Sequence, residues 1–133
     1  MPSGSLGSRF RLTAVRFQSP AERRREDEVA KYVFVVYTEP VEGQDDEYNR
    51  WYSDVHVADV LKIEGITAAR RFKLAPMDPP QDGHPPYLAL YEIETDDITK
   101  IPAAIRQGVQ DGSMPLSDAL DRSKNRTAYY EAL

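Results

Sequence analysis

Hydrophobic residues along this chain fall into short runs whose spacing alternates between that of strands and that of helices. The run from Tyr32 to Thr38 is rich in β-branched and aromatic residues, which predicts a strand. It lacks polar residues at alternate positions, so both of its faces are expected to be buried. Further strands are predicted over Ile66–Ala75, Tyr87–Glu94 and Arg126–Glu131. The third of these is also apolar on both sides, with Tyr87 and Tyr91 on one face and Leu88 and Leu90 on the other.

Two segments have the spacing of amphipathic helices. The first runs from about Asp46 to Ile63, is capped by Asp45 or Asp46, and ends at Gly65. One apolar stripe on it is formed by Trp51, Val55, Ala58 and Leu61, and an adjoining semi-polar stripe by Tyr48, Tyr52, His56 and Asp59. The second helix is predicted over about residues 98–107, with Asp96 or Asp97 as its cap and a loop over 108–115.

The order strand, helix, strand, strand, helix, strand predicts an α+β fold, a ferredoxin-like sandwich with a four-stranded antiparallel sheet. Two helices cover only one face of such a sheet, yet the first and third strands are apolar on both faces. Leaving that second face in water costs several kcal/mol, at about 25 cal/mol per Å² of apolar surface. We therefore expect a homodimer packed sheet to sheet, with a ligand pocket either between the sheets or between sheet and helix.

Composition narrows the possible chemistry. The chain has 133 residues, which suits one domain, and it contains no cysteine, which excludes disulfides and thiolate chemistry. Its only histidines are His56 and His84. No apolar run approaches the roughly 18 residues of a membrane span, and the first residues lack the apolar stretch of a secretory signal. We expect a cytoplasmic protein that does not bind membranes.

Charge divides the chain into two parts. Residues 1–31 carry a net charge of +3 and residues 32–133 a net charge of −8. An acidic body argues against nucleic-acid binding. Residues 1–30 are interpreted as an N-terminal extension, either flexible or with an added strand over residues 9–17, and residues 31–133 as a single ferredoxin-like domain.

The most informative stretch is Glu47–Phe72, in which Trp51 and Tyr52 precede His56 and Gly65 precedes the second strand. It resembles the first helix and second strand of EthD-like members of the dimeric α/β-barrel superfamily. The usual proline before the glycine is replaced by Glu64. The resemblance implies a homodimer with a small, largely apolar cavity in each subunit and the helix histidine facing it. It does not identify the reaction, because that superfamily supports many.

His56 is the candidate acid–base catalyst, with Tyr52 and Asp59 on its own helix as orienting groups. The alternative is that its ring only makes a packing contact. Arg70 and Arg71 point to opposite faces of their strand, so one of them meets the helix layer or the barrel interior. That arginine either holds an anionic ligand group or forms a salt bridge with an acidic residue.

Aromatic residues supply the other candidate substrate contacts: Trp51, Tyr37, Tyr87 and Tyr91. They can equally be core or interface residues. The chain has no phosphate-binding glycine loop and no spacing of metal ligands, and one histidine is weak support for haem, so we expect neither cofactor nor metal. Two functions remain open. One is a cofactor-free isomerase, cyclase, dehydratase or lyase acting on a small aromatic or cyclic oxygenated metabolite. The other is a non-catalytic protein that binds such a ligand.

Overall fold

Strand β1 (Ala30–Thr38) lies inside a four-stranded antiparallel sheet in the computed structural model of the chain, which describes residues 29–133. The strand order is β2 (Ile66–Lys73), β3 (Tyr87–Thr95), β1, β4 (Arg126–Glu131). Phe34 of β1 is paired with Tyr91 of β3 on one side and with Tyr129 of β4 on the other. The predicted ferredoxin-like α+β fold is confirmed, whereas the added strand expected within residues 9–17 lies outside the described residues.

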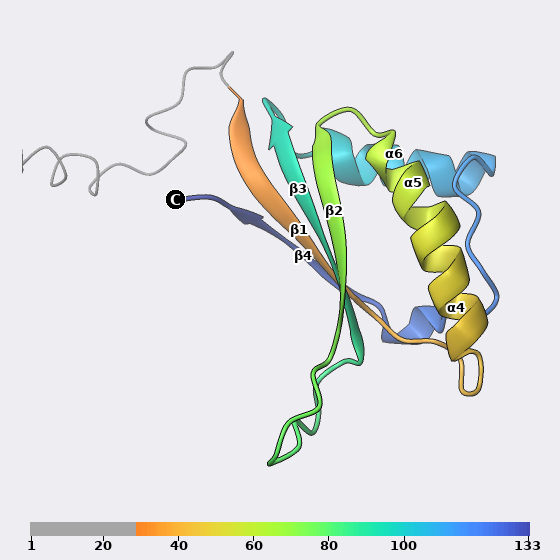
Figure 1. Cartoon of the computed structure of the whole chain (residues 1–133). Coiled ribbons are helices and arrows are strands. Elements are labelled where there is room, and N and C mark those ends of the chain that lie inside the picture. The colour runs from red at the N-terminus through yellow and green to blue at the C-terminus, as the bar shows by residue number, and fades with distance from the viewer. Residues whose placement is uncertain (1–28) are drawn as a thin grey trace, which may run out of the picture.

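The helices lie on one face of the sheet (Figure 1). The first is continuous but irregular: α4 (Asp45–Trp51) leads into the π-helical turn η1 (Tyr52–His56), which leads into α5 (Val57–Leu61). The second is α6 (Lys100–Asp111), and a short 3-10 turn, η2 (Arg122–Lys124), precedes β4. Among residues 29–133, nothing covers the other face of the sheet (Figure 1).

The predicted apolar stripe of the first helix was wrong in its second half. Leu61 is 40% exposed and Ala58 is also exposed, whereas Tyr48 and Tyr52 of the stripe read as semi-polar are almost completely buried. The π turn explains the change, because it adds one residue to a turn and rotates everything after it. Beyond the turn, Val60 faces the core at 2% exposure.

Two predicted helix ends also differ. No side chain caps α4: its N-cap is Gln44, and Asp45 and Asp46 lie in the first turn. Helix α6 continues past Gln107 to Asp111, and Gly108 within it is packed against the side chain of Met114. A Cβ at position 108 would lie 2.7 Å from Met114 Sδ, so the glycine permits this contact and does not end the helix.

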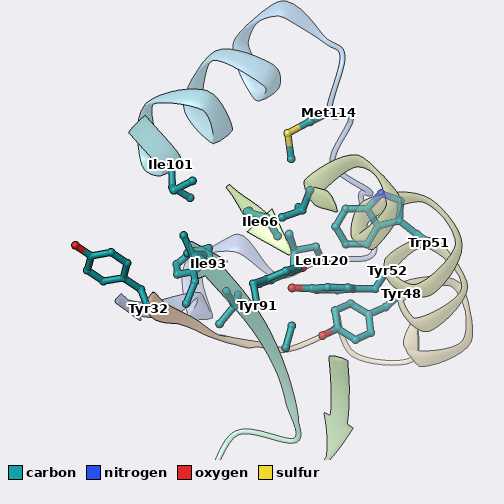
Figure 2. Packing of buried hydrophobic residues seen from close by; sticks show 14 of the residues in the cluster. Tyr32, Tyr48, Trp51, Tyr52, Ile66, Tyr91, Ile93, Ile101, Met114 and Leu120 are labelled. Atoms are coloured by element: carbon teal, nitrogen blue, oxygen red, sulfur yellow. The ribbon is translucent and has the colours of Figure 1, made fainter. Parts of the chain in front are cut away.

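The core lies between the inner face of the sheet and the helices (Figure 2). Alternate residues of β1 and β3, among them Phe34, Tyr91 and Ile93, are buried there. Phe34 stacks on Tyr129 with ring centroids 4.2 Å apart. A hydrogen bond between the hydroxyls of Thr38 and Tyr48 connects β1 to α4. These contacts fix the position of the first helix over the sheet.

Candidate functional site

A cavity of about 160 Å³ lies between the inner face of the sheet and the helices. Its walls come from β1, β3, the π turn, α6 and the segment that leads into β4, and most of them are apolar. Cavities of comparable volume bind a single benzene-sized ring. Among the polar groups at its wall are His56, Tyr52, Tyr91 and Trp51.

His56 is held in this wall by aromatic contacts. Its ring stacks on Trp51, with centroids 4.7 Å apart and planes 27° apart, and meets Tyr52 edge-on at 5.0 Å. Trp51 is itself fixed by a 3.2 Å hydrogen bond from its indole nitrogen to the carbonyl of Pro115. The Nδ1 atom of His56 is buried and has no hydrogen-bond partner. A buried polar atom without a partner costs free energy, so a ligand group that bonded to it would recover that cost.

The protonation state of His56 follows from its surroundings. Its pKa is lowered to about 4, mainly by burial; the charge of Asp59 acts in the opposite direction and that of Arg71 in the same direction as burial. The imidazole is therefore neutral at pH 7. In that form one ring nitrogen accepts a hydrogen bond and the other donates one.

A second buried polar group, the hydroxyl of Tyr91, lies at the same cavity, next to the hydroxyl of Tyr52. Burial raises the pKa of Tyr91 to about 12 and raises that of the neighbouring Tyr52 as well. Both phenols are therefore protonated at neutral pH. With His56, Tyr91 forms a pair of buried polar groups in an otherwise apolar wall, an arrangement that suits a small ligand carrying one or two oxygen atoms.

The two residues expected to orient His56 are placed differently from each other. Tyr52 contacts it through the ring edge. The carboxylate of Asp59 forms an ion pair with Lys62 at 3.6 Å, and it forms no hydrogen bond to His56. Ring packing by Trp51 and Tyr52 therefore holds the imidazole in place.

The predicted separation of Arg70 and Arg71 is found in the structure. Arg71 faces the helix layer, where its guanidinium donates to Ser53 Oγ and Asn49 Oδ1, both at 2.9 Å. Arg70 lies on the opposite face, 5.3 Å from the ring centroid of Phe72. Tyr37 also lies on that outer face, beside Arg126. Arg70 and Tyr37 thus lie away from the His56 cavity.

Tyr87 lies outside the cavity too. Its hydroxyl accepts a hydrogen bond from Asn49 and donates one to Asp45, so it belongs to the surroundings of Arg71. The inward-facing residues that were predicted to form one site therefore form two separate groups in the structure. Trp51, Tyr52, His56 and Tyr91 surround the cavity, while Arg71 and Tyr87 lie in a separate groove.

Part of the cavity wall was missed by the sequence analysis. Leu116, Leu120 and Asn125, from the segment between α6 and β4, line it together with Thr127 of β4, whereas the sequence predicts only a loop over residues 108–115 and no cavity wall beyond it. Met114, Ala119 and Leu120 are all buried. The apolar residues of this irregular segment indicate that it is buried. Because they have neither helical nor strand periodicity, they do not indicate which part of the molecule the segment covers.

Two absences hold for residues 29–133. No group of three or more histidine and acidic side chains is arranged to hold a metal ion. None of the helices in this range combines the length and apolar character needed to cross a bilayer.

Comparison with solved protein structures identifies the type of fold, whereas comparison of sequences finds no match. No family model matches the chain, and no curated protein matches it in sequence. An ethyl tert-butyl ether D (EthD) family protein from Bacillus halodurans has a TM-score of 0.54 at 17% identity, over 78% of this chain and 99% of its own. A NIPSNAP family protein from Agrobacterium tumefaciens has a TM-score of 0.50 at 8% identity, over 78% and 87%. A dimeric ferredoxin-like protein of unknown function from a Jannaschia species has a TM-score of 0.48 at 17% identity, over 77% and 99%. The chain thus has the EthD-like, ferredoxin-like fold, and at these identities the likeness concerns the fold alone.

Proposed function

We propose that this protein binds a small aromatic or cyclic oxygenated molecule in the His56 cavity and acts on it as a cofactor-free acid–base enzyme. The observation that carries the proposal is the buried, unpartnered Nδ1 of His56 in a cavity that the buried hydroxyl of Tyr91 also lines. Two such atoms in one small apolar cavity are matched by a ligand with an apolar ring and a hydroxyl or carbonyl oxygen.

The proposed chemistry follows from the neutral imidazole. His56 would take a proton from the ligand, and Tyr91 would donate a hydrogen bond to the oxygen on which negative charge develops. Burial makes the free imidazole a weak base. An enolate or phenolate formed next to it would favour the imidazolium and so raise its basicity during the reaction. Isomerisation, cyclisation, dehydration and lyase reactions can each begin with such a proton transfer.

Ligand binding can be tested with p-cresol and toluene, which differ by one hydroxyl group. The chain has a single tryptophan, Trp51, so its indole N–H gives one assigned NMR signal at the cavity wall. We expect p-cresol to shift this signal and to bind at least about tenfold more tightly than toluene, because only p-cresol satisfies a buried polar atom. In His56→Phe that preference should shrink, while His84→Phe, in an exposed loop, should keep it. Equal binding of the two probes by the unmodified protein would contradict the proposal.

Catalysis can be separated from binding by proton exchange. The alternative function is a ligand-binding or accessory protein with the same cavity and no turnover. A panel of small cyclic ketones and enones in D₂O should exchange their acidic C–H protons faster in the presence of the enzyme, and His56→Phe should abolish the effect. Tight binding with no exchange above the buffer rate would favour the binding protein.

We also propose that the protein is a homodimer formed through the outer face of the sheet. Besides Tyr37, this face carries half-buried apolar side chains from three strands: Val33, Val35, Leu88, Leu90 and Ala128. Arg126 makes one end of the face basic, whereas Glu92 and Glu94 make the other end acidic despite the presence of Lys31 there; Arg70 lies near the centre, beside Leu90. A twofold axis in the interface and across the strands would bring the basic end of one copy against the acidic end of the other. A second copy therefore suits the face in both hydrophobicity and charge.

A further inference from the structure

An open groove of about 370 Å³ lies at the edge of the sheet, between α4 and β2, and does not share lining residues with the His56 cavity. Its walls are Asn49, Arg71, Phe72, Lys73 and Tyr87. Two cationic side chains and the aromatic ring of Tyr87 thus face one solvent-accessible groove, whereas the ring of Phe72 lies on the outer face of the strand beside Arg70. The composition is that of a binding site for an anion attached to an apolar group.

Arg71 is the central group of this groove. It is half-buried, and its guanidinium carbon lies 4.4 Å from the ring centroid of Tyr52, 5.4 Å from that of Tyr48 and 5.7 Å from that of Tyr87. Its hydrogen-bond acceptors, Asn49 and Ser53, are both neutral. Within residues 29–133, no carboxylate forms an ion pair with it, although residues 32–133 carry a net charge of −8. A half-buried cation without a counter-ion is ready to receive one from a ligand.

The hydrogen bonds around Arg71 hold it in place without neutralising it. Asn49 accepts from Arg71 through Oδ1 and donates to the Tyr87 hydroxyl through Nδ2 at 3.1 Å. Tyr87 in turn donates to the carboxylate of Asp45 at 3.2 Å. The nearest carboxylate in this chain of contacts therefore reaches Arg71 only through two neutral groups. Two of the five guanidinium N–H donors bind Asn49 and Ser53, which leaves donors for a ligand.

We infer that this groove is a second binding site, for a small aromatic monocarboxylate held by Arg71. The planar guanidinium matches a planar carboxylate, and the ring of Tyr87 is available to contact the ring of the ligand. Lys73 adds a second positive charge. Because the body of the protein is acidic, a single negative charge is favoured over the double charge of a phosphate. The inference goes beyond the proposed function and does not depend on it, since neither His56 nor its cavity takes part.

Benzoate is the probe, with benzamide as a neutral analogue of the same shape and phenyl phosphate as a dianion. The assigned N–H signals of the Arg71 guanidinium and the Asn49 amide are followed by NMR. We expect benzoate to shift both signals, benzamide to leave them unmoved, and phenyl phosphate to bind more weakly than benzoate. Equal shifts with benzamide would overturn the inference, and tighter binding of phenyl phosphate would overturn the assignment to a carboxylate.

Three variants locate the binding. Arg71→Gln should weaken benzoate binding by at least about tenfold, whereas Arg70→Gln, its neighbour on the opposite face, should change it by less than about twofold. Asn49→Asp has almost the same shape, so it keeps the packing. It places a carboxylate against Arg71 and should abolish benzoate binding. Equal losses in the two arginine variants would show a general charge effect and overturn the inference.

Two further variants separate this site from other causes. If Arg71→Gln fails to fold, Asn49→Asp is the variant that tests the inference. Benzoate binding that is retained in Asn49→Asp would overturn it. Asp45→Asn removes the negative charge at the end of the hydrogen-bond chain and should tighten benzoate binding. His56→Phe should leave benzoate binding unchanged, so the two sites fail independently. Loss of benzoate binding in His56→Phe would place the probe in the cavity and contradict a site at Arg71.

Discussion

His56 combines two properties that a residue in a stable core normally avoids, a titratable ring in a mostly buried position and a buried nitrogen with no partner. The spacing of Tyr52 and His56 was sufficient to predict that both lie on one side of a helix. It was not sufficient to predict that Asp59, three residues later, pairs with Lys62. Lys62, three residues beyond Asp59, takes this carboxylate instead, and sequence spacing alone does not decide between the two partners.

The buried histidine should make stability depend on pH. The pKa of His56 falls from 6.5 to about 4 on folding, so between these values the unfolded chain binds a proton that the folded protein does not. Stability is therefore fully present above about pH 6.5, declines as the pH falls toward about 4, and loses up to about 3 kcal/mol in total through this group.

Urea unfolding at about pH 7 and about pH 4.5 measures this loss. In His56→Gln the loss between the two pH values should be smaller by most of that amount, whereas His84→Gln, in the exposed loop, should behave like the unmodified protein. If His56→Gln lost as much stability on acidification as the unmodified protein, the desolvation of His56 would be excluded as a cause.

For Arg71, the sequence predicts the direction of the side chain but not the partners that it contacts. The alternation of a strand correctly separated Arg70 from Arg71. The sequence left open whether the inward arginine meets an acid or a ligand, and the acid-rich composition favoured an ion pair. The neutral partners Asn49 and Ser53 come from α4 and the π turn, so only the docking of that helix on β2 reveals them.

At the scale of elements, the sequence located the four strands and both helices of residues 29–133. The helices were located by their apolar period, and the two central strands by short β-branched, aromatic or apolar runs bounded by turn residues. The predictions that were wrong concern a helix end and a buried helix face, where contacts between distant residues or an irregular turn outweigh the local sequence pattern. Gly108 has the residue type of a helix end, but it lies within α6 and is packed against Met114. The π turn likewise leaves the element in its predicted place and changes only which side chains face the core.

Gly65, between α5 and β2, is required for two separable reasons, and a matched pair of variants distinguishes them. Its φ is +102°, and a Cβ there would lie 3.3 Å from the carbonyl oxygen of Glu94 and 3.3 Å from Ile101 Cδ1. Gly112, after α6, has a similar φ of +83° with nothing within 4 Å of its Cβ position. Gly112→Ala should therefore cost about 1 kcal/mol from backbone strain alone. Gly65→Ala should cost at least about 1 kcal/mol more, because its neighbours must also move.

Chemical denaturation of the two variants measures both costs. Gly43→Ala serves as a second control, since it also has a positive φ and open space around the Cβ position. Equal destabilisation at positions 65 and 112 would show that the Glu94 and Ile101 contacts relax without cost, leaving only the backbone conformation to explain why a glycine is present.

At the scale of the whole molecule, the sheet has one face covered by helices and one that no described residue covers (Figure 1). Strands that are apolar on both faces predict a sheet with a second apolar face, because hydrophobic side chains on both faces of a strand require two covering layers and two helices supply only one. Sequence could not identify the second layer. The outer face carries Arg126 toward one end and Glu92 and Glu94 toward the other, with valine and leucine between them, and we propose that a second copy supplies the missing layer.

Leu90 lies near the centre of this outer face, between Val35 of β1 and Arg70 of β2. If two copies pack through the face, Leu90→Glu places a charge in the dry centre of the interface and should convert a dimer into a monomer, at micromolar concentration, in light scattering. Leu61→Glu makes the same change at an exposed leucine on the helix side and should leave the dimer intact. Circular dichroism should show both variants folded, because Leu90 lies outside the core between sheet and helices. An unmodified protein that is monomeric under these conditions would refute the dimer, and the apolar outer face would then need a different partner.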